Sequence, residues 1–471
     1  MNHSRTKAVV AVLVLCALMA ACAVGPDYQR TELIAAPHWY ANVPHDGDTG
    51  SLTRWWSQFD DPLLAELITV AEVDNPGLNQ ALARIAQSRA GVASARSALF
   101  PALSANASAQ RSKSPLSPNQ PQTLEQGALD AIWEVDLFGG KRRGREAAQA
   151  RYEGAQAQWH DARVSLAAEI AQEYIGLRTC EALVNDVEKD VLSRRESERL
   201  SQLKVSAGFE SSADGALSMA SAADAAVRLN AQQAECDISV KALVSLTGLP
   251  EPELRDRLSG RSGILPAPAS FAIQQLPAKV LLQRPDMVAA ERELAAASAE
   301  IGVAEAARYP SLTLLGSVGF QSLRAGGLTI DGGSWSIGPS LSLPIFNAGR
   351  LAANTDAAQA RYDEASASYA GRARQAVKEV EQALVRLHSA STREADAKRA
   401  ADGYDKVFQA ANDRWRVGAG SLLELEDARR IAVGSHTQLL GVQRERVAAW
   451  ISLYRAVGGG WSPDDTVNAS N

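Results

Sequence analysis

The sequence predicts a mainly α-helical fold that also contains transmembrane β-strands, built as two copies of one repeat. Three observations predict this fold class. Long proline-free stretches rich in Ala, Glu, Arg and Gln are typical of helices. Four shorter segments alternate apolar and polar residues, as half-buried strands do. Short sequence landmarks recur about 209 residues apart, which indicates an internal duplication.

The N-terminus has the features of a secretory signal. Arg5 and Lys7 precede an apolar stretch that is too short to span a bilayer, so residues 1–21 are expected to be removed. The run LMAAC ends at Cys22 and resembles the cleavage box of bacterial lipoproteins, so Cys22 is expected to carry diacylglycerol and palmitoyl lipid. Ala23 follows, and in such lipoproteins a non-Asp residue there indicates release to the outer membrane. The alternative is an ordinary secreted protein with a chance cysteine.

Internal similarity divides the rest of the chain. ALFPALS begins at residue 98 and matches ARYPSLT at residue 307, while DLFGGKR at residue 136 resembles PIFNAGR at residue 344. Gly208 corresponds to Gly418 at nearly the same spacing. We therefore expect a signal peptide at 1–21, a lipidated N-terminal segment and equatorial region at 22–74, a first repeat at 75–250, a linker and equatorial region at 251–283, a second repeat at 284–461 and a C-terminal tail at 462–471.

Each repeat has the same predicted order of elements: a short helix, two strands, a long helix and a return helix. Pro76 suits a first helical turn, and Gly208 ends the first long helix. The first repeat is expected to contain a helix at 76–99, strands at 101–110 and 128–138, and helices at 143–205 and 212–248. The second is expected to contain a helix at 285–308, strands at 310–320 and 334–344, and helices at 351–416 and 421–457.

The lengths of the predicted helices indicate how they pair. In the first repeat the long helix would span about 95 Å, and the short and return helices together about 91 Å. Stacked end to end, the two shorter helices would pair along the whole long helix. We expect an elongated helical body with the strands at one end and the glycine turns at the other.

The predicted strands have the properties of transmembrane strands. The segment 334–344 alternates serine with large apolar residues, which places one face on apolar material. Each strand candidate has about the length of a tilted membrane strand. Aromatic residues fall at the helix-proximal strand ends, where an interfacial girdle would lie: Phe100, Phe138, Tyr309 and Phe346. The alternative is a small soluble sheet that covers the ends of the helices.

Four strands require partner chains. They cannot close a barrel, and open sheet edges are not tolerated in lipid. Because about eight strands are the practical minimum, the chain must oligomerise, and strand count alone permits two, three or four copies. With three copies, a ring of helices would enclose an aqueous lumen of roughly 25–30 Å.

Composition excludes several functional classes. The chain has 471 residues with 48 Lys and Arg against 54 Asp and Glu, so its formal net charge is −6. This balance argues against nucleic acid as a partner, because nucleic-acid binding requires a basic face. Hydrophobic residues make up 46% of the chain, which excludes disorder. The 6 histidines have no metal-ligand spacing, and no phosphate loop or nucleophile motif occurs, so neither an enzyme nor a bound cofactor is expected.

Several segments, in this order, resemble the TolC-like outer membrane efflux proteins of bacteria, specifically the lipoprotein branch called the NodT subfamily. They are CAVGPDY at 22–28, RWWSQFDDPLL at 54–64, NPGLNQALARIAQSRA at 75–90, RPDMVAAERELAAASAEIGVAEAARYPSLTL at 284–314, SLPIFNAGR at 342–350 and AVGGGW at 456–461.

The resemblance implies a homotrimer. An α-helical tunnel would cross the periplasm, and a twelve-stranded β-barrel, with four strands per protomer, would sit in outer-membrane lipid. It also implies a passive conduit for drugs or other small toxic compounds. An inner-membrane RND-type transporter would deliver them through a periplasmic adaptor (membrane fusion) protein.

The same resemblance assigns a role to the two glycine turns. KVSAGFESSAD at 204–214 and RWRVGAGSLLELED at 414–427 resemble the tip motif of the family, where adaptor hairpins meet the channel. Gly208, Gly418 and Gly420 are therefore expected to contact the adaptor.

In that motif two carboxylates line the narrowest point, and they correspond to Glu424 and Asp427. Residues three apart share a helix face, so around a threefold axis they would form rings of negative charge that favour cations. Ser421 and Glu424 also form the S-x-x-E pattern of a capping box, so capping and pore lining both stay open for Glu424. Arg414 and Arg416 could close the resting tip by pairing across subunits, with plain solvation as the alternative.

Two cysteines suggest a disulfide. Cys180 and Cys236 each lie 28 residues from Gly208, so they would be level in an antiparallel helical pair. In an oxidising compartment this position permits a bond, and buried free thiols are the alternative.

Two other functions remain open at this point. Within the channel class, the chain could be an outer-membrane exit duct for type I protein secretion or metal efflux. In a different class, a periplasmic coiled-coil adaptor or scaffold also has long helical hairpins.

Overall fold

The computed structural model describes residues 23–30, 39–41, 55–113, 121–266, 281 and 284–461. The predicted signal at 1–21, Cys22 and the predicted tail at 462–471 lie outside these described residues. The backbone groups into two compact units. The first unit comprises Met1–Glu32, Ala83–Gln156 and Ala289–Gly371, and the second comprises Leu33–Leu82, Ala157–Val288 and Arg372–Asn471.

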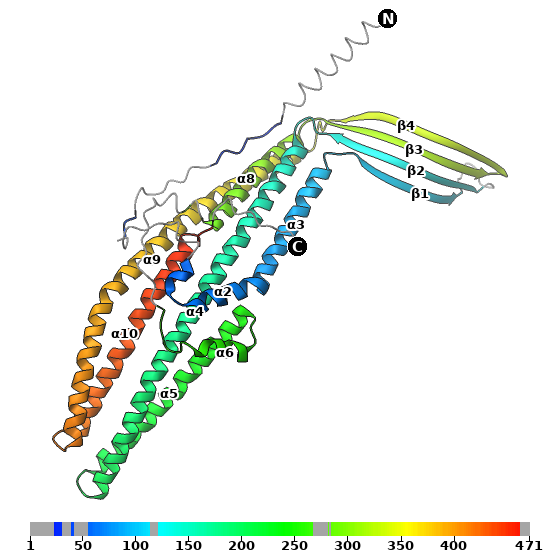
Figure 1. The fold of residues 1–471 in the computed structure, drawn as a ribbon. Helices are drawn as coiled ribbons and strands as arrows, with labels where there is room; N and C mark the ends of the chain where they lie inside the picture. The colour runs from blue at the N-terminus through cyan, green and yellow to red at the C-terminus, as the bar shows by residue number, and fades with distance from the viewer. Residues whose placement is uncertain are drawn as a thin grey trace. The chain divides into compact units, whose positions relative to one another are not determined.

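The structure confirms a mainly helical fold with a small antiparallel sheet and with the same element order in both halves (Figure 1). The first half contains α2 (Pro62–Asp74), α3 (Pro76–Ser97), β1 (Ala102–Ser112), β2 (Gln122–Val135), α4 (Gly140–Ser206), α5 (Ser212–Thr247) and α6 (Glu251–Ser259). The second half contains α8 (Pro285–Ala306), β3 (Ser311–Ala325), β4 (Leu328–Ser342), α9 (Arg350–Arg416) and α10 (Leu422–Ala456). The long helices α4 and α9 each have 67 residues.

The helices of the two repeats begin and end within three residues of their predicted bounds. Local capping explains this agreement. Ser211 caps α5 with its side chain, and Gly248 ends α5 in the left-handed conformation at φ 71°. Ser421 caps α10 in the same way as Ser211 caps α5.

Among the helices in the described residues, α2 and α6 are absent from the predicted elements. Asp61 caps α2, because its side chain accepts a hydrogen bond from the N–H of Leu63, and Pro62 occupies the first turn. α6 begins with Glu251 and Glu253, whose charges suit a helix N-terminus. The pair Asp61–Pro62 is therefore a feature of the sequence from which the start of α2 could have been predicted.

The four strands form one antiparallel sheet in the order β1-β2-β3-β4 (Figure 1). The predicted strand bounds were partly wrong. β3 and β4 extend past the predicted 310–320 and 334–344 to a two-residue turn at Gly326 and Gly327, with φ of 59° and 82°. Such positive φ values are what a tight hairpin turn requires. The prediction at 128–138 likewise missed the first part of β2, which begins at Gln122.

The strand register gathers many of the large apolar side chains on one face of the sheet. Leu129 pairs with Val318, which pairs in turn with Trp335. The next row pairs Asp130 with Ser317, and Ser317 with Ser336. Because side chains alternate along a strand, the apolar rows share one face. Large exposed residues on that face are Leu103, Leu129, Val318, Trp335, Ile337 and Leu341.

Each unit has its own packing. In the first unit, small alanine side chains let α4 and α8 approach closely, and the buried cluster contains Ala147, Ala150, Ala295, Ala296 and Ala299. In the second unit the core is larger and includes Trp55, Phe59, Ile170, Leu243 and Trp450. None of the described helices combines the length and apolarity needed to cross a membrane.

Candidate functional site

The α4–α5 and α9–α10 hairpins end in matching glycine turns (Figure 1). Gly208 and Gly418 have φ of 81° and 77°. In each turn the following N–H donates to the carbonyl five positions earlier at 2.8 Å, which satisfies carbonyl groups left over at the helix end. Gly420 differs, because a Cβ there would lie 3.3 Å from Arg414 Cβ and from Glu424 Oε2. Backbone conformation thus requires glycine at 208 and 418, whereas at Gly420 the close approach of Arg414 and Glu424 favours it.

Glu424 caps the N-terminus of α10. Ser421 Oγ accepts from the N–H of Glu424 at 3.2 Å, and Glu424 Oε2 accepts from the N–H of Ser421 at 3.4 Å. Ser211 and Asp214 form the same capping box on α5, at 3.1 and 3.4 Å. Arg414 Nη2 lies 3.7 Å from Glu424 Oε2 of the same chain. The structure therefore shows the hydrogen bonds by which Glu424 caps α10. That Glu424 also lines a pore stays a prediction.

The other two predicted tip charges have different neighbours. Asp427 lies one turn further along α10 and pairs with Arg430, with Nη2 and Oδ1 3.0 Å apart. Arg416 is the last residue of α9. It lies near Glu196, whose pKa is held below its usual range mainly by a hydrogen bond from Arg199 and further by the charge of Arg416. Asp427 and Arg416 thus lie near charged residues that the sequence analysis did not single out.

A small core holds the ends of α4 and α9 together. Trp415 is 2% exposed and packs with Leu422 and Leu425. Lys204 Nζ lies 4.2 Å from the centre of the Trp415 ring and donates to the Trp415 carbonyl at 3.3 Å. Lys204 also pairs with Glu210 at 3.0 Å. This cation–π contact links the two hairpin ends, and sequence reasoning missed it.

A set of charged side chains is buried between α4, α5 and α10. Arg194 of α4 places Nε 2.9 Å from Asp190 Oδ2 and Nη1 2.5 Å from Glu426 Oε2. Ser221 of α5 donates to Glu426 Oε2 at 2.8 Å, and Arg429 pairs with the other oxygen of the same carboxylate. The side chains of Asp190 and Arg429 are only 3% and 2% exposed. We call these five residues the buried ion network.

The buried ion network reaches all four helices of the two hairpins. Arg429 donates to Ser197 Oγ on α4 at 2.8 Å, and its guanidinium lies 5.5 Å from the Phe408 ring on α9. Burial lowers the pKa of Arg429, and the charge of Arg194 adds to this effect while Glu426 opposes it. Two carboxylates balance two guanidinium groups, so separating them would leave buried charges unpaired. In the sequence, only two local acid–base spacings pointed to this network, Asp190 with Arg194 on α4 and Glu426 with Arg429 on α10.

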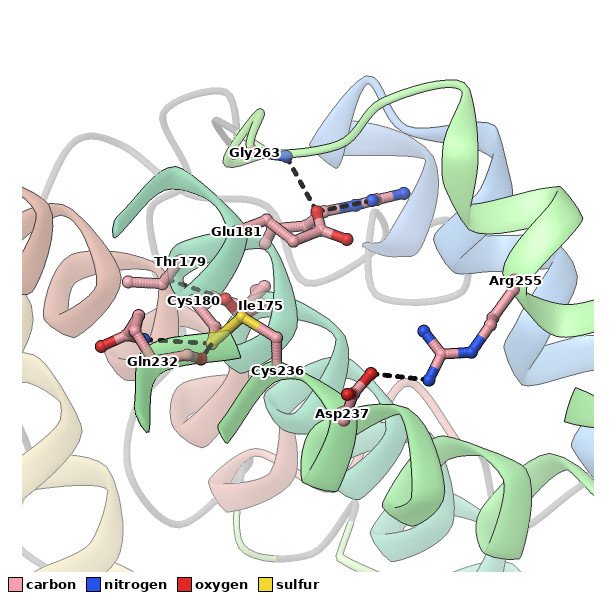
Figure 2. The surroundings of a disulfide bond; sticks show 10 residues. Ile175, Thr179, Cys180, Glu181, Gln232, Cys236, Asp237, Arg255 and Gly263 are labelled. Carbon is pink, nitrogen blue, oxygen red and sulfur yellow. Dashed lines mark hydrogen bonds and ion pairs between the residues drawn. A yellow bond between two sulfur atoms is a disulfide. The ribbon is translucent and has the colours of Figure 1, made fainter. Parts of the chain in front are cut away.

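Cys180 of α4 and Cys236 of α5 form a disulfide, with their Cα atoms 5.5 Å apart (Figure 2). This is the pairing that equal spacing from the tip turn predicts. The Gln232 amide donates to Cys180 Sγ at 3.1 Å. Arg255 of α6 pairs with Asp237 at 2.7 Å, beside the bond (Figure 2). The disulfide joins the two helices where α6 also contacts α5.

The described N-terminal segment is fixed against the first turn of α4. The N–H of Val24 donates to Phe138 O at 3.0 Å. Arg143 is buried and donates to the carbonyl groups of Val24 and Gly25, both at 3.4 Å, and to Asp27 Oδ1 at 2.6 Å. One buried guanidinium thus contacts three residues of the N-terminal segment.

Two close backbone approaches complete this attachment. A Cβ on Gly25 would lie 2.4 Å from Gly302 Cα, and one on Gly139 would lie 2.9 Å from Ala23 Cα. Only glycine permits such distances. The contacts therefore hold Ala23 at the start of α4. Cys22, the predicted lipidation site, precedes Ala23 and lies outside the described residues.

The RPD segment that contributed to the family resemblance has a structural explanation in the second unit. Arg284 Nη2 lies 2.8 Å from Asp286 Oδ2, and its Nη1 lies 2.8 Å from Glu379 Oε2. It also donates to the carbonyl of Ala456 at 2.9 Å. Burial tends to raise the pKa of Asp286, but Arg284 outweighs burial and holds that pKa below its usual range. Arg284 thereby connects the start of α8 with α9 and the end of α10.

These arrangements favour structural pairing of charges. In the part of the chain that the structure describes, no group of His, Cys, Asp or Glu side chains is placed to hold a metal ion. The buried pairs are suited to hold helices together, whereas the tip carboxylates of Glu424 and Asp427 are exposed.

The comparisons with known proteins agree with the predicted family. The sequence matches the profile described as outer membrane efflux protein over residues 67–249 and 276–459. The solvent efflux pump outer membrane protein SrpC of Pseudomonas putida is 30% identical over 459 residues, which cover 94% of this chain and 97% of that protein. Nodulation protein T of Rhizobium leguminosarum bv. trifolii is 28% identical over 456 residues, which cover 95% of this chain and 96% of that protein.

A solved structure shows the same likeness. The outer-membrane channel OprN aligns with a TM-score of 0.82 and 30% sequence identity. The alignment covers 93% of this chain and 100% of that chain. The similarity in fold therefore extends over nearly the whole length of both proteins.

Proposed function

Because the chain belongs to the outer membrane efflux protein family, we propose that it is the outer-membrane channel of an efflux pump and a passive conduit for small toxic compounds. Its likeness to SrpC, a solvent efflux pump outer membrane protein, supports this function over nearly the full length. The likeness to the OprN channel supports a pore. A periplasmic adaptor does not fit a chain of this family.

The observation that carries the proposal is the sheet with its two unpaired edges. In the described part of the chain, β1 and β4 each pair along one side only, and a continuous apolar face crosses all four strands. Unpaired edges are not tolerated in lipid, so each edge must pair with a neighbouring copy. A homotrimer would supply twelve strands, enough for a closed outer-membrane barrel with an aqueous lumen.

The tips support the proposed partners. Phe209 and Val417, beside the two glycine turns, are 83% and 79% exposed. These apolar side chains are available for contact with a protein partner. In this proposal a periplasmic adaptor binds there and connects the channel to an inner-membrane RND-type transporter.

The resting tip would be closed and opened by adaptor binding. The Lys204–Trp415 contact and the buried ion network would keep the α9–α10 hairpin on the α4–α5 hairpin. Adaptor binding would then have to supply the free energy that separates them.

Lipid on Cys22 belongs to the same proposal. The contacts of Arg143 hold the residues after Cys22 next to Phe138. Lipid at that position would enter the membrane beside the proposed barrel. One acyl anchor plus a barrel gives stable attachment.

Conductance tests the channel directly. The full chain, extracted in detergent from outer membranes, is expected to insert into planar lipid bilayers and to produce discrete conductance steps. A deletion strain is expected to become more susceptible to drugs or solvents. A water-soluble monomer that never conducts would contradict the proposal.

A further inference from the structure

A pocket of about 740 Å³ lies within the first unit, between α3, α4, α8 and the N-terminal segment. Four arginines line it, namely Arg96, Arg142, Arg145 and Arg292, against two glutamates. Tyr28 of the N-terminal segment also lines it. The pocket thus has a surplus of positive charge beside the segment that follows the predicted lipid anchor.

Two of the four arginines have no partner to neutralise them. Arg142 pairs with Asp136 at 3.2 Å, and Arg292 pairs with Glu153 at 3.0 Å. Arg96 and Arg145 are exposed, and neither guanidinium forms a hydrogen bond or an ion pair with any residue that the structure describes. The pocket therefore offers two free guanidinium groups from two different helices.

The charge at the start of α4 is unusual for a helix. A helix N-terminus carries partial positive charge and favours acidic side chains. α4 has none in its first turn, and arginines stand there instead. Arg143 is compensated by Asp27, but Arg145 is not compensated by any described acid. Asp136, which precedes the helix, already caps this end, because its carboxylate accepts from the N–H groups of Lys141 and Arg142 at 3.0 and 2.9 Å. An external anion would therefore be held by the side chain of Arg145.

The position of the pocket arginines matches the depth of lipid headgroups. Phe138 and Tyr309 stack 4.7 Å apart at the helix-proximal end of the sheet, where the membrane interface is proposed. Arg142 and Arg145 follow the first residue of α4 by about 3 and 8 Å along the helix axis. The polar headgroup layer is about 5–8 Å thick. Arg96 lies in the last turn of α3, just before the sheet.

We propose that this pocket binds the phosphate-bearing headgroup of an anionic phospholipid. The inference rests on the proposed placement of the sheet in the outer membrane. Guanidinium groups bind phosphate oxygens with paired hydrogen bonds, and basic pockets at a membrane interface bind anionic headgroups. Tyr28 places the bound headgroup beside the N-terminal segment, so lipid anchor and bound lipid would hold the same part of the protein.

Binding of defined lipids to the full-length protein in detergent tests this inference. The probes are phosphatidylglycerol, phosphatidylcholine and inorganic phosphate, and native mass spectrometry counts the bound molecules. The unaltered protein is expected to bind phosphatidylglycerol in preference to phosphatidylcholine. The double variant Arg96→Gln with Arg145→Gln is expected to bind phosphatidylglycerol roughly 30-fold more weakly, about fivefold for each charge.

A matched pair of exposed arginines provides the control. Arg195 of α4 and Arg386 of α9 have no hydrogen bond or ion pair with any described residue, and they lie in the second unit. Their double glutamine variant is expected to keep the preference for phosphatidylglycerol. If both double variants lose the same affinity for phosphatidylglycerol, the loss comes from net charge and not from the pocket, and the inference is overturned.

Two results on the unaltered protein would also overturn it. One is equal binding of phosphatidylglycerol and phosphatidylcholine. The other is displacement of phosphatidylglycerol by millimolar inorganic phosphate, which would make free phosphate the ligand. A conductance measurement shows which proposal has failed. If the protein conducts but shows no lipid preference, only the lipid-binding inference is wrong. If it does not conduct, the proposed channel function is wrong.

Discussion

Arg194 of α4 and Glu426 of α10 form an ion pair with Nη1 and Oε2 2.5 Å apart, although they lie 232 positions apart in the sequence. Their side chains are only 8% and 13% exposed. Water screens such a pair weakly, so breaking it leaves a charge buried without its partner. The pair therefore opposes separation of α10 from α4, which the proposed opening of the tip requires.

Replacing Glu426 is expected to weaken the closed tip. Glu426→Gln keeps the size of the side chain but leaves Arg194 and Arg429 without this carboxylate, at a cost of about 3 kcal/mol. We expect a lower unfolding temperature in detergent and a higher conductance of the isolated channel in planar bilayers.

The control is an exposed ion pair between α9 and α10, whose glutamate lies on the same helix as Glu426. Glu445 pairs with Arg393 at 2.6 Å, and both side chains are more than 40% exposed. Glu445→Gln should change unfolding by less than about 1 kcal/mol and leave conductance unchanged. If both glutamine variants behave alike, the buried ion network does not hold the tip.

The repeats, the helices and the tip turns could be predicted from the sequence, because their signals are local. Gly208 and Gly418 end helices through their own backbone conformation, and Ser211 and Ser421 cap the helices that follow. The strand bounds were less accurate. Gly332 and Gly333 lie within β4 and interrupt the alternation that marks a strand, so the prediction began after them.

The buried ion network could not be predicted, because its partners are distant in sequence. Asp190 and Arg194 have the spacing of an ordinary surface pair on a helix. Only the fold places Glu426 and Ser221 beside them. The Lys204–Trp415 contact was missed for the same reason. The disulfide could be predicted from the sequence, because Cys180 and Cys236 lie at equal distances on either side of Gly208.

Removing the charge of Asp427 tests the electrostatic part of the proposed pore. A ring of carboxylates favours cations, so Asp427→Asn is expected to lower cation selectivity and conductance in single-channel recordings. Because Asp427 and its partner Arg430 are exposed, stability should change by less than about 1 kcal/mol. Unchanged selectivity would remove Asp427 from this role.

Two variants separate the charge of Glu424 from its role in capping α10. Glu424→Gln keeps the capping hydrogen bond and removes the charge, whereas Ser421→Ala removes the cap and keeps the charge. Ser421→Ala should lower stability by about 1 kcal/mol without changing selectivity, as Ser211→Ala should at the other tip. A selectivity change in Glu424→Gln alone would assign Glu424 to the pore.

The disulfide between Cys180 and Cys236 is expected to stabilise the protein without affecting conduction. It closes a loop with a sequence separation of 56, so its loss should cost about 4 kcal/mol in the chain-entropy account. Unfolded protein should migrate faster on a gel without reductant than with it. The double variant Cys180→Ser with Cys236→Ser should unfold at lower temperature and conduct normally. Identical migration under both conditions would rule out the bond.

The Arg284–Asp286 pair predicts how stability depends on pH. Because Arg284 holds the pKa of Asp286 below its usual range, the unfolded chain binds a proton to Asp286 more readily than the folded protein does. The stabilisation is therefore complete above the unfolded pKa of about 3.9 and is lost as pH falls through the lower folded value. The unfolding temperature in detergent should stay level from neutral pH to about pH 5 and then fall. Asp286→Asn should lower the free energy of unfolding by about 3 kcal/mol at neutral pH, and its unfolding temperature should fall less below about pH 5. The exposed variant Glu445→Gln should show the same fall as the unaltered protein. If the unfolding temperature of Asp286→Asn falls below about pH 5 as steeply as that of the unaltered protein, other carboxylates cause the loss of stability in acid.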